Sequence, residues 1–283
     1  MKDGIVLMDG AVGTSLWAKA ERNGIAKDPV WKYNIEHPEI VAELAAEFAD
    51  AGAEMVLCNT FGANGPAVKR SSDYSVFEVV NTGVKIAKEA LKDKKAKCVL
   101  SLGPLSTLME PYGDTTEEEA AQIYREMLDA GMREGPDAIL IQTFIDLSMM
   151  KVAAAEAKKY GVPVLCCLSF EKVGKTIMGN SVDDMIEELE PLGVDAIGMN
   201  CSIGPDLAIP VMKKFVGKTN LPLIFKPNAG KPILSSGGAV AAPYTAKTFA
   251  DEVAPALDFV DYIGGCCGSD PSYIKELASR MGR

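Results

Sequence analysis

Three cysteines of this sequence have the residue type and the spacing of a metal site. Cys266 and Cys267 are adjacent within the stretch GGCCG, and Cys201 lies well upstream in MNCSIG. Neighbouring residues of a regular strand point to opposite faces, so two adjacent thiols serve one site only where the backbone is irregular, which the flanking glycines allow. Three thiolates about 2.3 Å from one tetrahedral ion, with a fourth position open, are typical of a catalytic zinc.

The remaining four cysteines are expected to pack rather than react: Cys58, Cys98, Cys166 and Cys167. Cys166 and Cys167 lie inside an apolar run without glycine, and strand alternation sends one side chain inward and the other outward. Cys58 stands just before a strand end, where packing is favoured over ligation. Seven cysteines in 283 residues argue against a disulfide framework. Buried structural thiols are also the alternative explanation for Cys201, Cys266 and Cys267.

Composition excludes several classes of function. The chain has one histidine, His37, so a histidine-based zinc site within the chain is excluded and a Ser-His-Asp triad would depend on that residue. The net charge of −10 and the isoelectric point near 4.8 argue against nucleic acid and anionic membranes as partners. Without an apolar run of membrane-spanning length or an uninterrupted signal sequence, the expected location is the cytoplasm.

The elements that must position the cysteines alternate regularly. Apolar runs that predict strands lie at 4–10, 54–61, 96–104, 137–144, 162–170, 195–201, 221–228 and 261–267. Amphipathic segments that predict helices lie at 37–53, 75–91, 115–132, 146–161, 181–193, 206–219, 245–259 and 271–282. The strand runs are nearly continuous in apolar residues, as expected for parallel strands buried on both faces.

Eight β-then-α units predict a (β/α)8 TIM barrel, because such barrels take about 250 residues. We predict one domain spanning residues 1–283, with the long stretch 231–244 over the active-site end. A doubly wound open sheet is the alternative. The barrel is favoured because no G-x-G-x-x-G turn follows the first strand run.

Polar residues gather where the predicted strands end, which is where barrels of this kind build their active sites. The candidate substrate contacts at these ends are Asp9, Gly10, Asn59, Gln142, Thr143, Asn200 and Asn228. The sixth and eighth strands also end at Cys201 and at Cys266–Cys267. Strands two positions apart bring their ends within about 10 Å, so three thiolates around one zinc are feasible, and this arrangement favours the metal site over buried thiols.

These residues form a set that resembles a known family. The stretches DGAVGT, NTFGAN, GMNCSIGP, KPNAG and GGCCGSDP, in this order, resemble the homocysteine S-methyltransferase family over about residues 4–275. The resemblance implies a (β/α)8 barrel with zinc held by Cys201, Cys266 and Cys267. It further implies that Asn228 fills the fourth zinc position in the absence of substrate. Asp9 and Gly10 match positions that hold the amino acid substrate.

One position departs from the family pattern. The family commonly has Glu-Thr at the end of the fourth strand, where the carboxylate receives the amino group of the substrate, and this chain has Gln142-Thr143. A neutral amide accepts a hydrogen bond without the charge that roughly doubles its strength. Either a neighbour such as Asp9 or Asp146 compensates, or the thiol substrate is not homocysteine.

The resemblance implies a zinc-dependent S-methyltransferase that methylates a zinc-activated thiol, with homocysteine as the first candidate acceptor. Nothing in the chain resembles the folate- or cobalamin-binding modules of the large methionine synthases. The expected donor is therefore methylcobalamin, a corrinoid on a separate protein, or a small molecule such as S-methylmethionine. Two alternatives are a zinc- and thiol-binding component of a corrinoid methyl-transfer or demethylation system acting on another substrate, and a metal-free barrel enzyme.

Overall fold

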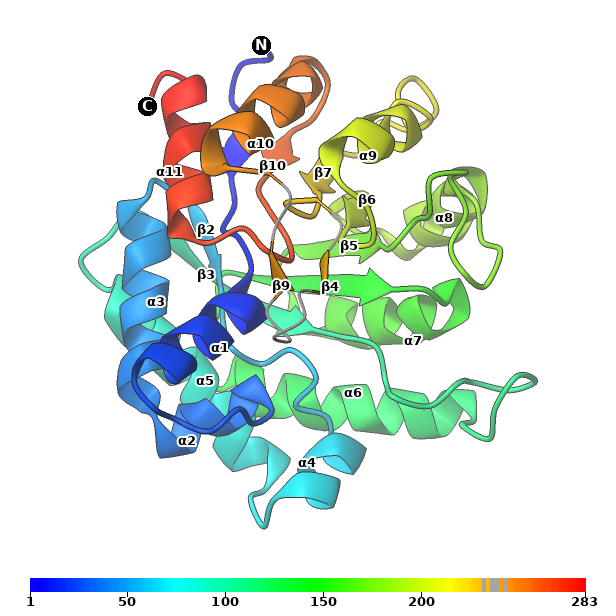
Figure 1. Cartoon of the computed structure of the whole chain (residues 1–283). Coiled ribbons are helices and arrows are strands. Elements are labelled where there is room, and N and C mark those ends of the chain that lie inside the picture. The colour runs from blue at the N-terminus through cyan, green and yellow to red at the C-terminus, as the bar shows by residue number, and fades with distance from the viewer. Residues whose placement is uncertain (231–232, 235–239, 242–243) are drawn as a thin grey trace.

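The strands form a closed parallel barrel. A computed structural model describes residues 1–230, 233–234, 240–241 and 244–283, and Figure 1 shows the barrel with its outer layer of helices. The barrel strands are β1 (Val6–Leu7), β2 (Met55–Leu57), β3 (Lys97–Leu102), β4 (Ala138–Phe144), β5 (Val164–Leu168), β6 (Ala196–Asn200), β7 (Leu223–Lys226) and β10 (Tyr262–Ile263). Their order is β1-β10-β7-β6-β5-β4-β3-β2. A parallel bridge between Met8 and Met55 joins β1 to β2 and closes the barrel, which confirms the predicted TIM barrel.

Helices cover the outside of the barrel. They are α1 (Val12–Arg22), α2 (Tyr33–Glu36), α3 (Pro38–Asp50), α4 (Gly65–Ser71), α5 (Val76–Leu91), α6 (Glu117–Met132), α7 (Leu147–Ala157), α8 (Val182–Leu189), α9 (Pro205–Met212), α10 (Ala246–Val253) and α11 (Pro271–Arg280). Among the described residues, no helix is long and apolar enough to cross a membrane.

Local sequence explains where several helices begin and end. Thr116 caps α6, and its hydroxyl accepts from the N–H of Glu119 while that glutamate bonds back to Thr116. Beyond α7, Gly161 takes the left-handed conformation at φ 71°, as its position after a helix predicts.

The core has two layers, as continuous apolar strands require. Side chains pointing inward fill the barrel, among them Met8, Leu57, Leu140 and Cys167. Outward side chains, Cys166 included, pack with the helices in a larger outer layer. Cys166 and Cys167 are both fully buried, so the prediction that this pair belongs to the core, with one thiol on each face, is confirmed.

Four acidic residues tie neighbouring strands together at the amino end of the barrel. They are Glu54, Asp137, Asp195 and Asp261, which precede β2, β4, β6 and β10. Their carboxylates accept hydrogen bonds of 2.8–2.9 Å from the backbone N–H groups of Leu7, Cys98, Val164 and Leu223, respectively. In return, the backbone N–H of each acid donates to the carbonyl of the partner residue whose N–H its carboxylate accepts from, at 2.7–2.9 Å. The barrel therefore repeats one clamp around its amino end.

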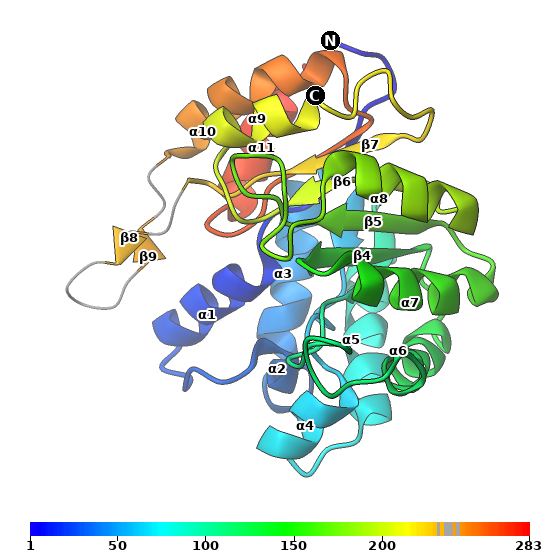
Figure 2. The ribbon, with the colours of Figure 1, turned by 90° about the vertical axis from the view of Figure 1, so that its right-hand side faces the viewer.

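Some predicted bounds were wrong. The strand runs 4–10 and 261–267 form strands of two residues each, because the backbone leaves the ladder to build the site. Helices α1, α2 and α4 were missed, and the helix predicted at 206–219 ends at Met212. In the stretch 231–244 the described part is an antiparallel pair, β8 (Ile233–Leu234) with β9 (Val240–Ala241), on the same side of the barrel as α1 (Figure 2). The prediction that this stretch covers the active-site end concerns mostly residues outside the described ranges.

Candidate metal and thiol site

The three predicted thiols meet at the carboxyl end of the barrel. Cys201 directly follows β6 and the Cys266–Cys267 pair follows β10, with β7 between these strands. The three Sγ atoms lie within 4.8 Å of one another, and those of Cys201 and Cys267 are 3.7 Å apart. Within the described residues this is the one group of three or more metal-binding side chains that is close enough to hold an ion.

The backbone is irregular where the site requires it. Three non-glycine residues of the described chain have positive φ: Thr143 at 65°, Cys201 at 63° and Ser202 at 60°. All three stand at the carboxyl ends of β4 and β6. Such conformations cost about 1–3 kcal/mol each and persist where surrounding structure imposes them, which is common at functional sites. The turn after Asn200 thus directs Cys201 toward the thiols of β10.

The glycines around Cys266 and Cys267 serve two separate purposes. Gly268 has φ 85°, so it supplies the predicted backbone freedom. Gly264 and Gly265 do not take positive φ; they are needed for space. A Cβ at Gly264 would lie 2.6 Å from the carbonyl oxygen of Asp9, and one at Gly265 would lie 2.1 Å from Ser269 Oγ. The β10 end can therefore pass close to the β1 end and to the turn that follows it.

The crowded thiols resist ionisation on their own. The hydrogen bond with Cys201 is the largest influence on the pKa of Cys266 and, with burial, raises it to about 12, although Cys267 opposes this. The hydrogen bond to Cys266 lowers the pKa of Cys201, but the bond to Cys267 and burial outweigh it and raise the pKa to about 11. A divalent cation reverses this preference because it binds thiolates rather than thiols.

Two asparagines lie beside the thiols. Asn200 Nδ2 is 2.7 Å from Thr143 Oγ1 and 3.6 Å from Cys266 Sγ, so its amide ties β4 to a candidate ligand. Asn228 runs alongside the cysteine pair, since the N–H of Cys266 donates to Pro227 and the N–H of Ala229 donates to Cys267. The buried Oδ1 of Asn228 has no hydrogen-bond partner among the described residues.

That unpaired oxygen matters because a buried acceptor without a partner carries a free-energy penalty. Backbone hydrogen bonds hold the Asn228 segment beside Cys266 and Cys267, and the three thiols lie close enough to share one ion. The donor set therefore fits a metal bound by three thiolates with a neutral oxygen at the fourth position, as the resemblance implies for Asn228.

A cavity of about 350 Å³ opens beside the thiols at the same end of the barrel. Its wall includes Cys201, Cys266 and Cys267, together with the predicted contacts Gly10, Asn59, Gln142 and Thr143. The other predicted contacts, Asp9, Asn200 and Asn228, do not belong to this wall. Asn200 and Asn228 instead lie behind it, against the thiols.

Asp9 lies below the cavity in a buried ion pair. Its Oδ1 accepts from Lys226 Nζ at 2.5 Å and its Oδ2 accepts from the N–H of Leu57 at 2.8 Å. The two side chains are 0% and 1% exposed, respectively. Burial raises the pKa of Asp9, and the charge and hydrogen bond of Lys226 act against that rise. Lys226 thus reaches the cavity wall with its charge already balanced.

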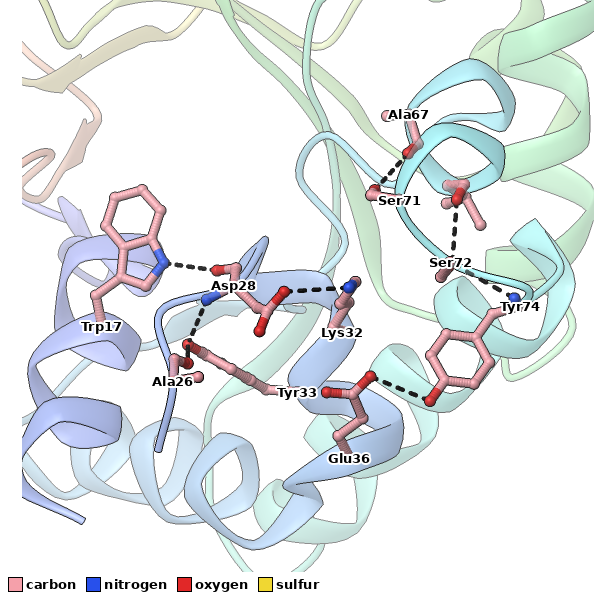
Figure 3. A network of polar contacts seen from close by, with 11 residues as sticks. Trp17, Ala26, Asp28, Lys32, Tyr33, Glu36, Ala67, Ser71, Ser72 and Tyr74 are labelled. Carbon is pink, nitrogen blue, oxygen red and sulfur yellow. Dashed lines mark hydrogen bonds and ion pairs between the residues drawn. The ribbon is translucent and has the colours of Figure 1, made fainter. Parts of the chain in front are cut away.

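Sequence reasoning missed the aromatic part of the wall. Trp17 of α1, Trp31 and Phe61 line the cavity with Val30. The segment carrying Trp31 is held by hydrogen bonds from Trp17 Nε1 to the carbonyl of Asp28 and from Tyr33 Oη to the carbonyl of Ala26, which Figure 3 shows. The two tryptophans of the chain fall on either side of one short loop, a signal that could have identified this wall.

The fold and the site define a class of protein: a closed (β/α)8 barrel whose carboxyl end carries a cavity and three thiols close enough to share one ion. Comparison with known proteins makes the class specific. The family model described as homocysteine S-methyltransferase matches residues 6–281, and the chain belongs to that family.

Curated relatives include two methionine synthases. Those of Mycobacterium leprae and Mycobacterium tuberculosis are 29% identical over 271 residues and 30% identical over 269 residues, respectively, each alignment covering 88% of this chain. The chain spans 22% of the length of each. The metallated form of the homocysteine methyltransferase MmuM from Escherichia coli superposes with a TM-score of 0.80 at 22% identity, over 99% of this chain and 97% of that one. This likeness supports the fold.

Proposed function

We propose that this chain is a zinc-dependent S-methyltransferase that methylates a thiol, with homocysteine, giving methionine, as the first candidate acceptor. The observation that carries the proposal is the meeting of Cys201, Cys266 and Cys267 in the wall of the cavity. Family membership supports the reaction type. The proposal treats residues 1–283 as one homocysteine-binding-type domain with a cytoplasmic location.

The three thiols would hold the zinc, and the unpaired Asn228 Oδ1 would be the neutral fourth donor. Bound zinc supplies a Lewis acid that keeps the acceptor sulfur as an electron-rich thiolate at neutral pH. The residues of the chain then position the reacting sulfur and transfer no proton to it. Asn200 orients Cys266 through its amide, and the apolar wall keeps water from the sulfur. No general base is required, and the single histidine, His37, lies outside the cavity wall.

The donor in this proposal is methylcobalamin, free or on a separate corrinoid protein, or a small methylated compound such as S-methylmethionine. The methionine synthase relatives support the first choice, since this chain matches about a fifth of their length.

A second candidate is a zinc- and thiol-binding component of a corrinoid methyl-transfer system that acts on a thiol other than homocysteine. Gln142 favours it, because this neutral side chain stands in the cavity wall where the family pattern has a carboxylate.

Metal analysis combined with turnover tests the proposal. We expect about one zinc per chain, lost in Cys201→Ser and in Cys266→Ser and kept in Cys167→Ala, whose thiol lies in the barrel interior. The zinc-loaded protein should transfer methyl groups from methylcobalamin or S-methylmethionine to a thiol. A zinc content below about half an equivalent that neither serine variant changes would reject the metal site.

A further inference from the structure

Among the residues that the structure describes, the cavity wall offers no carboxylate to a substrate. Its ionisable side chains among the described residues are the cysteines and Lys226, and Lys226 is paired with the buried Asp9. The stretch 231–243, whose side chains are not described, contains Lys231 and neither aspartate nor glutamate. An ammonium group bound at Gln142 would lose its hydration without gaining a carboxylate partner, because the anionic groups of the described wall are the thiolates that would hold the zinc. Buried charges without a partner of their own are costly.

Gln142 presents both a donor and an acceptor to the cavity. The N–H of Thr143 donates to Asn200 Oδ1 at 2.7 Å, which leaves Asn200 Nδ2 to face Gln142. This Nδ2 group lies 3.5 Å from Gln142 Oε1. The Nε2 group of Gln142 donates one hydrogen to Ser101 Oγ at 2.9 Å. A carboxamide has two donors and two acceptor sites, so one N–H and one lone pair remain for a ligand.

Asn59 adds a second acceptor to the same wall. Its Nδ2 donates to the carbonyl of Val30 at 2.7 Å and to Asn34 Oδ1 at 2.8 Å, which assigns the amide orientation. The remaining oxygen, Oδ1, is buried and has no hydrogen-bond partner among the described residues. The side chain is 2% exposed. An uncharged group able to donate a hydrogen bond would satisfy it.

We propose that Gln142 and Asn59 form a headgroup subsite that selects a hydroxy-thiol, a short thiol with an uncharged hydroxyl group where an amino acid has its ammonium group. The inference rests on the proposed thiol S-methyltransferase function and specifies its acceptor. The subsite is close to the thiols, because Asn200 Nδ2 contacts both Gln142 Oε1 and Cys266 Sγ, at 3.5 and 3.6 Å.

Hydrogen-bond complementarity distinguishes the two headgroups. A hydroxyl donates one hydrogen and accepts others, so it can accept from Gln142 Nε2 while it donates to Asn59 Oδ1 or Gln142 Oε1. An ammonium group only donates, which leaves the Gln142 N–H unpaired in addition to the uncompensated charge. A site built for one polar group rejects an analogue that leaves its buried groups unpaired.

The test compares homocysteine with 2-hydroxy-4-mercaptobutanoate, its analogue with hydroxyl in place of ammonium. Calorimetric titration of the zinc-loaded full chain should give tighter binding of the hydroxy-thiol by about tenfold or more. Gln142→Glu should reverse this order by restoring a negative charge. The matched control is Gln122→Glu, which adds the same charge on the exposed side of α6 and should leave the order unchanged.

The ratio of the two dissociation constants measured on the wild-type protein tests the hydroxy-thiol subsite even if Gln142→Glu does not fold. Tighter binding of homocysteine, or equal binding of the two thiols, overturns the hydroxy-thiol subsite and leaves the methyltransferase proposal standing. Propanethiol, which has no headgroup, reports on sulfur binding alone. If neither it nor the two acids binds the zinc-loaded protein, both proposals fail.

Discussion

Among single side chains, Lys226 is one whose loss should strongly destabilise the fold. Its ammonium group and the Asp9 carboxylate are almost fully excluded from water. Lys226→Met removes the cation and leaves an unpaired buried carboxylate, which typically costs about 3–5 kcal/mol. Urea unfolding of the metal-free protein should show a loss of this size, whereas Lys218→Met, which breaks an exposed ion pair with Asp183, should cost less than about 1 kcal/mol.

The double variant Asp9→Asn, Lys226→Met separates the charge from the packing. Asparagine keeps an acceptor for the N–H of Leu57, so the double variant should recover much of the stability that Lys226→Met loses. If the double variant is as unstable as the single one, the ion pair does not explain the cost.

At the amino end of the barrel, the clamp formed by each acid and its partner strand supports the strand pairs. Asp261 is the example chosen for the test: its carboxylate accepts from the N–H of Leu223 at 2.9 Å, forms a surface ion pair with Lys2 at 2.6 Å and is 28% exposed. Asp261→Ala leaves that N–H unpaired and should cost about 1–2 kcal/mol by urea unfolding. Asp261→Asn keeps an acceptor for that N–H, so it should lower the free energy of unfolding by less than Asp261→Ala does.

This clamp is far from the cysteines, so its loss should leave zinc content unchanged. Asp93→Ala provides the background value, because Asp93 is exposed and makes no hydrogen bond or ion pair within the described residues. If Asp261→Ala destabilises no more than Asp93→Ala, the clamp contributes nothing measurable. The finding would then limit the role of these acids to setting the register of the strands.

Elements with strong periodicity were predictable, and short ones were not. The long helices α5 and α6 have caps and apolar faces that mark their bounds. Helix α4 was missed although Asn64 caps it and Pro66 stands in its first turn, because a stretch of seven residues shows too little periodicity. The two-residue strands β1 and β10 were predicted too long, since apolar sequence continues past the point where the backbone turns into the site.

For the whole molecule, the sequence predicted the cluster of three thiols and part of the cavity wall, but not the aromatic side of that wall. The positions of Cys201, Cys266 and Cys267 followed from strand order, which parallel topology makes regular. The unpaired oxygens of Asn59 and Asn228 did not follow, because each depends on which neighbours the other amide atoms meet. Likewise, no pattern indicated that Asp9 would be sequestered by Lys226.

Zinc would link Cys201 to Cys266 and Cys267, which are far apart in the sequence. Metal binding and the stability of the fold should therefore be coupled. A metal that binds the folded chain and not the unfolded one stabilises it by RT ln(1 + [Zn]/Kd), about 4 kcal/mol at a thousandfold excess over Kd. We expect a chelator to lower the melting temperature of the wild-type protein. Cys201→Ser should melt at one temperature with or without the chelator.

The sign of the pH dependence follows from the thiol pKa values. In the metal-free fold the pKa of Cys266 is raised to about 12 and that of Cys201 to about 11, so zinc must displace protons from thiols that hold them tightly. The metal-bound form has lost these protons; its added stability is present at high pH and is lost as pH falls. The chelator-induced drop in melting temperature should therefore shrink from about pH 8 to about pH 6. A drop of equal size at both values would mean that thiolates do not hold the metal.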